Sequence, residues 1–125
     1  MFIKLLSTLF FALLFTACSS SNDPKEIAIE LCEYNKIADY ESIKEYADDD
    51  LKTQLNDLKV MKTMAKKTKE GREAIEEQEK FLASVNCKES TKVTKQDNGS
   101  YLVVNDQSEL YFQLKMENGS WKMFK

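Results

Sequence analysis

Three cysteines are the residues best suited to chemistry in this chain, because the sequence contains no histidine. Cys18, Cys32 and Cys87 show no CxxC spacing, and thiolates without histidine lack the four ligands of a usual zinc site. No serine, lysine or cysteine has a recognisable base partner, and no glycine-rich loop is available to hold phosphate. The sequence therefore predicts no metal, no cofactor and no catalytic residue.

Cys18 ends an N-terminal apolar segment. Lys4 supplies one positive charge, and the apolar run after it has about 11 residues, fewer than the ~20 that a spanning helix needs. The closing residues, Leu14-Phe15-Thr16-Ala17-Cys18, resemble the lipobox of bacterial lipoproteins. The resemblance implies that residues 1–17 are a signal peptide and that Cys18 carries lipid. The alternatives are an ordinary secretory leader cut after Ala17 and an uncleaved anchor.

Length and charge limit the domain organisation and the partners of the remaining chain. We expect residues 18–24 to form a lipidated N-terminus and tether, and residues 25–125 to form a single domain. The chain has 18 basic and 21 acidic residues, a net charge of −3, and no basic tract interleaved with aromatic residues. We therefore expect no nucleic-acid partner and no electrostatic adhesion to anionic lipid. Acyl chains on Cys18 would hold the protein on the bilayer.

Cys32 and Cys87 remain as an even pair once Cys18 is lipidated. An even pair in an exported domain predicts a disulfide. On the chain-entropy model, a closed loop of about 55 residues contributes roughly 4 kcal/mol of stability. The alternative is two separate buried thiols.

Aspartates mark the beginnings of the predicted helices. Asp23 precedes Pro24, Asp39 lies three residues before Ser42, and Asp48 opens an acidic run, all of which are typical of helix N-termini. Apolar residues then recur at helical spacing, as in the series Ile27, Leu31, Tyr34, Ala38 and the series Leu51, Leu55, Leu58, Met61, Ala65. Residues 66–73 contain no apolar side chain, and we expect a break or kink near Gly71.

After Cys87 the sequence becomes typical of antiparallel strands. Asp97-Asn98-Gly99 and Glu117-Asn118-Gly119 predict tight hairpin turns, and a third turn fits residues 105–107. These turns divide the segment into strands near 88–95, 100–105, 109–117 and 120–124. Alternation predicts one apolar face, formed by Leu110, Phe112, Leu114, Met116, Trp121 and Met123.

A helical half with an antiparallel meander after it resembles the cystatin-like, nuclear-transport-factor-two-like fold. The lipobox, the Asp39-Tyr40-Glu41-Ser42 step and the closing Gly119-Ser120-Trp121-Lys122 hairpin make the chain similar to small bacterial lipoproteins of unknown function in the lumazine-binding-like branch. The resemblance covers about 25–125. It implies an α+β fold in which N-terminal helices pack on a curved antiparallel sheet of about four strands, a cystatin-like cone. For a deep pocket, however, the sheet is short of strands.

Six residues are candidates for a pocket or an exposed binding surface in such a fold. Enzymes of the superfamily generally use an Asp or His base with Tyr or Asp donors, but this chain has no histidine. Aromatic residues on amphipathic elements usually belong to the core or its rim. The candidates are Tyr34, Asp39, Tyr46, Tyr101, Phe112 and Trp121.

Two functions fit these features. The first is a non-catalytic interaction module, anchored in the bacterial cell envelope, that binds another envelope protein. The alternative is a carrier or sensor of a small apolar ligand held between sheet and helices. The large inward-facing side chains can fill the space between sheet and helices, which favours the interaction module. Ser19 after the lipidated cysteine resembles outer-membrane lipoproteins of Gram-negative bacteria, which implies an outer-membrane protein facing the periplasm.

Overall fold

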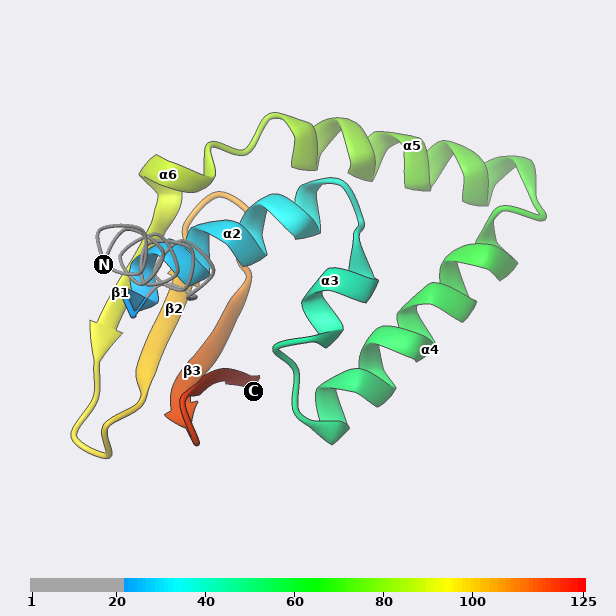
Figure 1. Cartoon of the computed structure of the whole chain (residues 1–125). Helices are drawn as coiled ribbons and strands as arrows, with labels where there is room; N and C mark the ends of the chain where they lie inside the picture. Colours follow the sequence, from blue (N-terminus) through cyan, green and yellow to red (C-terminus); the bar gives the residue numbers. More distant parts are fainter. Residues whose placement is uncertain (1–21) are drawn as a thin grey trace, which may run out of the picture.

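The computed structural model describes residues 22–125 and has an α+β architecture (Figure 1). Helices come first and a four-stranded antiparallel sheet comes after them, as the sequence predicts. The sheet is not strongly curled, so it departs from the curved cone that the resemblance implied. Residues 1–21, with the predicted signal peptide and Cys18, lie outside the described part. The helices are α2 (Pro24–Lys36), α3 (Tyr40–Lys44), α4 (Asp49–Ala65), α5 (Lys69–Ala83) and α6 (Cys87–Ser90); the strands are β1 (Thr91–Lys95), β2 (Tyr101–Asn105), β3 (Tyr111–Glu117) and β4 (Ser120–Phe124).

The three predicted aspartate caps are confirmed. Asp23 accepts a hydrogen bond from the Lys25 amide at 3.0 Å, and Asp48 accepts one from the Leu51 amide at 2.9 Å. Asp39 caps α3 through the amide of Ser42 and also accepts from its hydroxyl at 2.6 Å. Each such cap is worth about 1 kcal/mol, because it satisfies a helix amide that has no partner within the helix.

The break between α4 and α5 falls at residues 66–68, a few residues before the predicted position near Gly71. Thr68 takes the N-cap position of α5, and its hydroxyl accepts from the Gly71 amide at 3.0 Å. Gly71 itself lies in the first turn of α5, where a Cβ atom would stand 1.9 Å from the Ala65 carbonyl oxygen. Glycine therefore allows the two helices to meet closely, while threonine sets where the second one begins.

The strands form a simple meander in the order β1-β2-β3-β4. Asn118 and Gly119 both have positive φ, 51° and 79°, as a two-residue type I′ hairpin requires. The first predicted strand is shorter than expected, because Asn86 caps the short helix α6 and the strand begins only at Thr91. The third begins at Tyr111 instead of residue 109, since Glu109 takes a left-handed φ of 58°.

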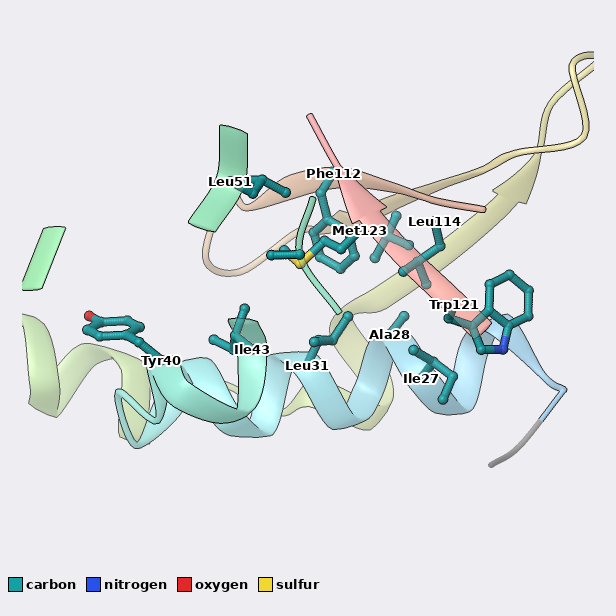
Figure 2. Close-up of a cluster of buried hydrophobic side chains, with 12 residues drawn as sticks. Ile27, Ala28, Leu31, Tyr40, Ile43, Leu51, Phe112, Leu114, Trp121 and Met123 are labelled. Carbon is teal, nitrogen blue, oxygen red and sulfur yellow. The ribbon is translucent and has the colours of Figure 1, made fainter. Parts of the chain in front are cut away.

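The main core lies between the sheet and helices α2, α3 and the start of α4 (Figure 2). From the helices and the segments beside them come Ile27, Ala28, Leu31, Tyr40, Ile43, Ala47 and Leu51; from the sheet come Val103, Phe112, Leu114, Trp121 and Met123. The predicted apolar face of the sheet is thus buried over most of its length. Met116, near the final hairpin, was predicted to be buried with this face but is 38% exposed.

A disulfide ties α2 to α6, as the sequence predicts. Cys32 and Cys87 are both buried, with their Cα atoms 5.8 Å apart. Asn105, only 2% exposed, lies beside the bridge: its amide nitrogen donates to the Ser90 hydroxyl at 2.8 Å, and its side-chain carbonyl accepts from the Gln107 and Ser108 amides. This second, smaller core holds the beginning of the sheet against the first helix.

Candidate functional site

Two of the predicted site residues meet at a carboxylate that the sequence did not single out. The Tyr34 hydroxyl donates to Glu30 at 2.6 Å, and the Tyr46 hydroxyl donates to the same carboxylate at 3.5 Å. Glu30 and Tyr34 lie one turn apart on α2, so their contact follows from helical spacing. Tyr46 joins them from sixteen residues away, which only the packing of α3 on α2 determines.

The neighbouring carboxylate changes the acidity of both phenols. The hydrogen bond to Glu30, aided by partial burial, raises the pKa of Tyr34 to about 12. Burial raises the pKa of Tyr46, and the negative charge of Glu30 adds to the effect. Both phenols are therefore neutral over the physiological range. They act as hydrogen-bond donors that orient Glu30, and neither is suited to abstract a proton.

The other predicted residues lie apart from this pair. Asp39 is occupied as the cap of α3. Tyr101 and Trp121 pack edge to face with ring centroids 5.9 Å apart. Trp121 lies near Ile27 of α2, away from Tyr40 (Figure 2). Phe112 is 3% exposed in the main core. The structure therefore does not bring the six predicted residues into one site.

An apolar cavity of about 180 Å³ lies between α4, the first two helices and the sheet. Phe112 is the one predicted site residue on its wall. Most of the lining is aliphatic or aromatic, and the polar members, Asn35, Gln54 and Lys125, are few. The walls come from Leu31, Asn35, Tyr40, Ile43, Leu51, Gln54, Leu55, Leu58, Leu110, Tyr111, Phe112, Met123 and Lys125.

The size of this cavity limits what it holds. Its volume of about 180 Å³ is smaller than the roughly 300–1,000 Å³ of sites for drug-sized ligands. It is close to that of an engineered apolar cavity of about 150 Å³ that holds one benzene molecule. The cavity thus fits a single ring or a short branched chain, such as one large apolar side chain.

Helix α4 continues the apolar character of the cavity along its outer surface. The predicted series on this helix divides in two: Leu51 and Leu55 pack on the core, whereas Leu58 and Met61 are 38% and 65% exposed. Met64 is 61% exposed one turn further on. We call Leu58, Met61 and Met64 the α4 stripe. Because Leu58 also lines the cavity, the stripe and the cavity form one continuous apolar surface.

A larger hollow of about 480 Å³ lies beside β4 and is wide open. Its walls carry Lys52, Lys115 and Lys122 against Asp48, Asp49 and Glu117. The opposite charges balance, and Asp48 is already engaged as a helix cap. This hollow has the character of a solvated surface, so the cavity beside α4 is the better candidate for a binding site.

Comparison with protein-family models, with curated proteins and with solved structures found no match for the chain. Within residues 22–125 no helix is both long and apolar enough to cross a membrane. In the same range no group of three or more His, Cys, Asp or Glu residues is placed to hold a metal ion.

Proposed function

We propose that this protein is a lipid-anchored envelope lipoprotein that acts as a non-catalytic interaction module. The cavity beside α4 takes an apolar side chain of another envelope protein, and the α4 stripe extends the contact. One observation carries the proposal: large apolar side chains that the core does not bury are exposed in continuity with a cavity of the right size for an anchor residue.

Anchoring through Cys18 is part of the proposed mechanism. Two or three acyl chains hold a protein on a bilayer, whereas one chain does so only marginally. Confinement to the layer next to the membrane raises the effective concentration of any partner anchored there. A small contact surface is then sufficient to keep the two proteins bound. The identity of residue 19 as serine supports an outer-membrane location facing the periplasm.

Membership of the cystatin-like, lumazine-binding-like lipoproteins is also part of the proposal. The order of the elements, with helices before an antiparallel meander, supports it. The shallow sheet departs from a closed cone, and this departure favours a surface for binding over a deep pocket for catalysis.

The second candidate function is a carrier or sensor of a small apolar ligand. The apolar walls of the same cavity favour it. Its small volume restricts the ligand to one ring or a short chain, so a long acyl chain is excluded as cargo in this conformation.

Native mass spectrometry of the protein extracted from its own membrane, with thiols alkylated before reduction, tests both functions. We expect an acyl mass on Cys18, unlabelled Cys32 and Cys87, and a second protein bound. Leu58→Asp should remove the second protein. Val60→Asp is the matched control, because Val60 is 58% exposed on the same helix and does not line the cavity.

Each other outcome has a definite meaning. A small bound mass in place of a protein would establish the carrier. A chain that is bare in every variant would contradict the interaction module, and a chain without acyl mass would contradict the anchor.

A further inference from the structure

The turn between α4 and α5 gathers positive charge in a chain whose net charge is negative. Residues 59–72 contain six Lys or Arg residues and a single carboxylate, Glu70, whereas the whole chain has a net charge of −3. Lys59 pairs with Glu41 at 3.6 Å, and the Lys62 ammonium lies 5.0 Å from the Tyr40 ring centroid. The remaining four cations, Lys66, Lys67, Lys69 and Arg72, are exposed, and we call them the basic turn.

The basic turn is more than the usual placement of charge at helix ends. Lysines at the end of α4 match its dipole, but Lys69 and Arg72 lie in the first turn of α5, where the dipole favours acidic residues. Arg72 donates to the Lys66 carbonyl at 2.9 Å. None of the four forms an ion pair with a described carboxylate. Lys66 and Arg72 line a hollow that they share with Glu76 and Glu79, so Lys67 and Lys69 are the cations most available to a partner.

The α4 stripe connects the cavity to the basic turn. Leu58 lines the cavity, and Met61 and Met64 follow it at steps of three residues, each of which turns about 60° back around the helix axis. Lys67 lies just beyond the end of the helix. At 1.5 Å per residue, Leu58 and Lys67 lie about 14 Å apart along the helix axis. The cavity, the stripe and the cations thus lie on a path that winds around α4 from an apolar end to a positive end.

We propose that the partner is a protein segment carrying a bulky apolar residue and, about 14 Å further along, a run of acidic residues. The apolar residue enters the cavity, and the acidic run meets the basic turn. Methionine side chains suit this role, because their flexibility lets one surface accept differently shaped segments. The inference rests on the proposed interaction module and names the chemistry of its partner.

Two features favour a protein segment over the anchoring bilayer. The start of α2, which comes after the tether, and the α4–α5 turn lie at opposite ends of the molecule (Figure 1). Four exposed carboxylates of α5, those of Glu73, Glu76, Glu77 and Glu79, also come soon after the basic turn. A broad anionic surface would be repelled by all four, whereas a narrow segment that follows α4 to Lys67 and Lys69 meets fewer of them.

Peptide titration of the full chain in nanodiscs of zwitterionic lipid tests the inference. The probe peptide carries a phenylalanine, a spacer of about four residues, which spans about 14 Å when extended, and a run of glutamates. One control replaces the glutamates by lysines, and another replaces the phenylalanine by alanine. The methionine methyl signals in the NMR spectrum report where each binds: Met123 lines the cavity, Met61 and Met64 are on the stripe, and Met116 lies elsewhere.

The acidic peptide should shift Met123, Met61 and Met64 and leave Met116 unchanged. It should bind about tenfold more tightly than the lysine peptide, since two or three exposed ion pairs each add a modest amount. At an ionic strength of about 1 M, where the screening length is ~3 Å, that preference should vanish. Lys67→Glu with Lys69→Glu should abolish the preference, whereas Lys92→Glu with Lys95→Glu on β1 should not.

The contrary outcomes separate this inference from the proposed function. Equal binding of the acidic and lysine peptides, with Met123 shifted, would overturn the inference and leave the interaction module standing. No shift with any peptide would contradict both. Stripe shifts with anionic vesicles alone would assign the surface to a bilayer, and shifts that depend on the concentration of the chain itself would assign it to a second copy; either result overturns the inference.

Discussion

The two halves of this molecule use their apolar residues differently. Around the sheet, α2 and α3 bury most of their apolar side chains, and the Cys32–Cys87 bridge holds this half together. Helices α4 and α5 are both longer than α2, yet only Leu51 of α4 and only Ile75 of α5 are buried. The apolar side chains that the α4–α5 hairpin leaves exposed are free to bind a partner. The buried core around the sheet holds that hairpin in place.

Loss of the disulfide should strongly destabilise the half of the molecule formed by α2, α3 and the sheet, which we call the packed half. Replacing Cys32 and Cys87 together by alanine removes a closed loop of 55 residues, which on the chain-entropy model costs about 4 kcal/mol. Urea unfolding monitored by circular dichroism measures this. A loss below about 1 kcal/mol would mean that the smaller core around Asn105 holds α2 to the sheet without the bridge.

A pair of truncations sharpens the contrast between the halves. Leu114 is 0% exposed in the main core and Met64 is 61% exposed on the α4 stripe. Leu114→Ala should cost about 2–5 kcal/mol, because it leaves a cavity among packed neighbours. Met64→Ala should change the free energy of unfolding by no more than about 0.5 kcal/mol. Similar losses in the two variants would show that the stripe belongs to the core after all.

Gly71→Ala should loosen the hairpin and spare the packed half. The added Cβ would meet the Ala65 carbonyl oxygen, a backbone atom that cannot move aside without shifting the end of α4. Overpacking of this kind costs about 1–3 kcal/mol. Amide hydrogen exchange should speed up in α4 and α5 only. Faster exchange in the strands as well would show that the two halves unfold as one unit.

The smallest predicted effect concerns alkaline pH. The Tyr34 pKa is about 12 in the folded chain and about 10 when unfolded, so the folded state retains a proton that the unfolded state has lost between these values. The stability of the packed half should therefore fall as pH rises from about 10 to about 12. Tyr34→Phe should flatten this fall in unfolding curves recorded at several pH values. An unchanged slope would contradict the hydrogen bond to Glu30.

Features set by short stretches of sequence were predictable, and those set by packing were not. Asp23, Asp39 and Asp48 identify helix starts because a cap acts within three residues, and the Asn118-Gly119 turn follows from backbone preference alone. The disulfide was predictable from the even number of cysteines that remains when Cys18 is set aside. The break was predicted near Gly71 and falls at residues 66–68, because Thr68, whose hydroxyl caps α5, was not recognised as the local signal for the start of that helix.

The candidate site was harder to predict than the fold. Aromatic residues were chosen for their chemistry, but Tyr101 and Trp121 pack on each other, and only Phe112 reaches the cavity. The apolar series along α4 was visible in the sequence and indicated burial. Periodicity identifies an apolar face without saying what covers it, so the exposure of Met61 and Met64 required the structure.

Whether the cavity and the α4 stripe form the binding surface is tested by hydrogen exchange of the chain in membranes of the cells that produce it, compared with the purified chain. We expect slower exchange in the membrane sample for the amides of residues 54–67, because a bound partner suppresses local opening of α4. The strands should exchange at the same rate in both samples. Equal rates along α4, or protection confined to the sheet, would contradict the account.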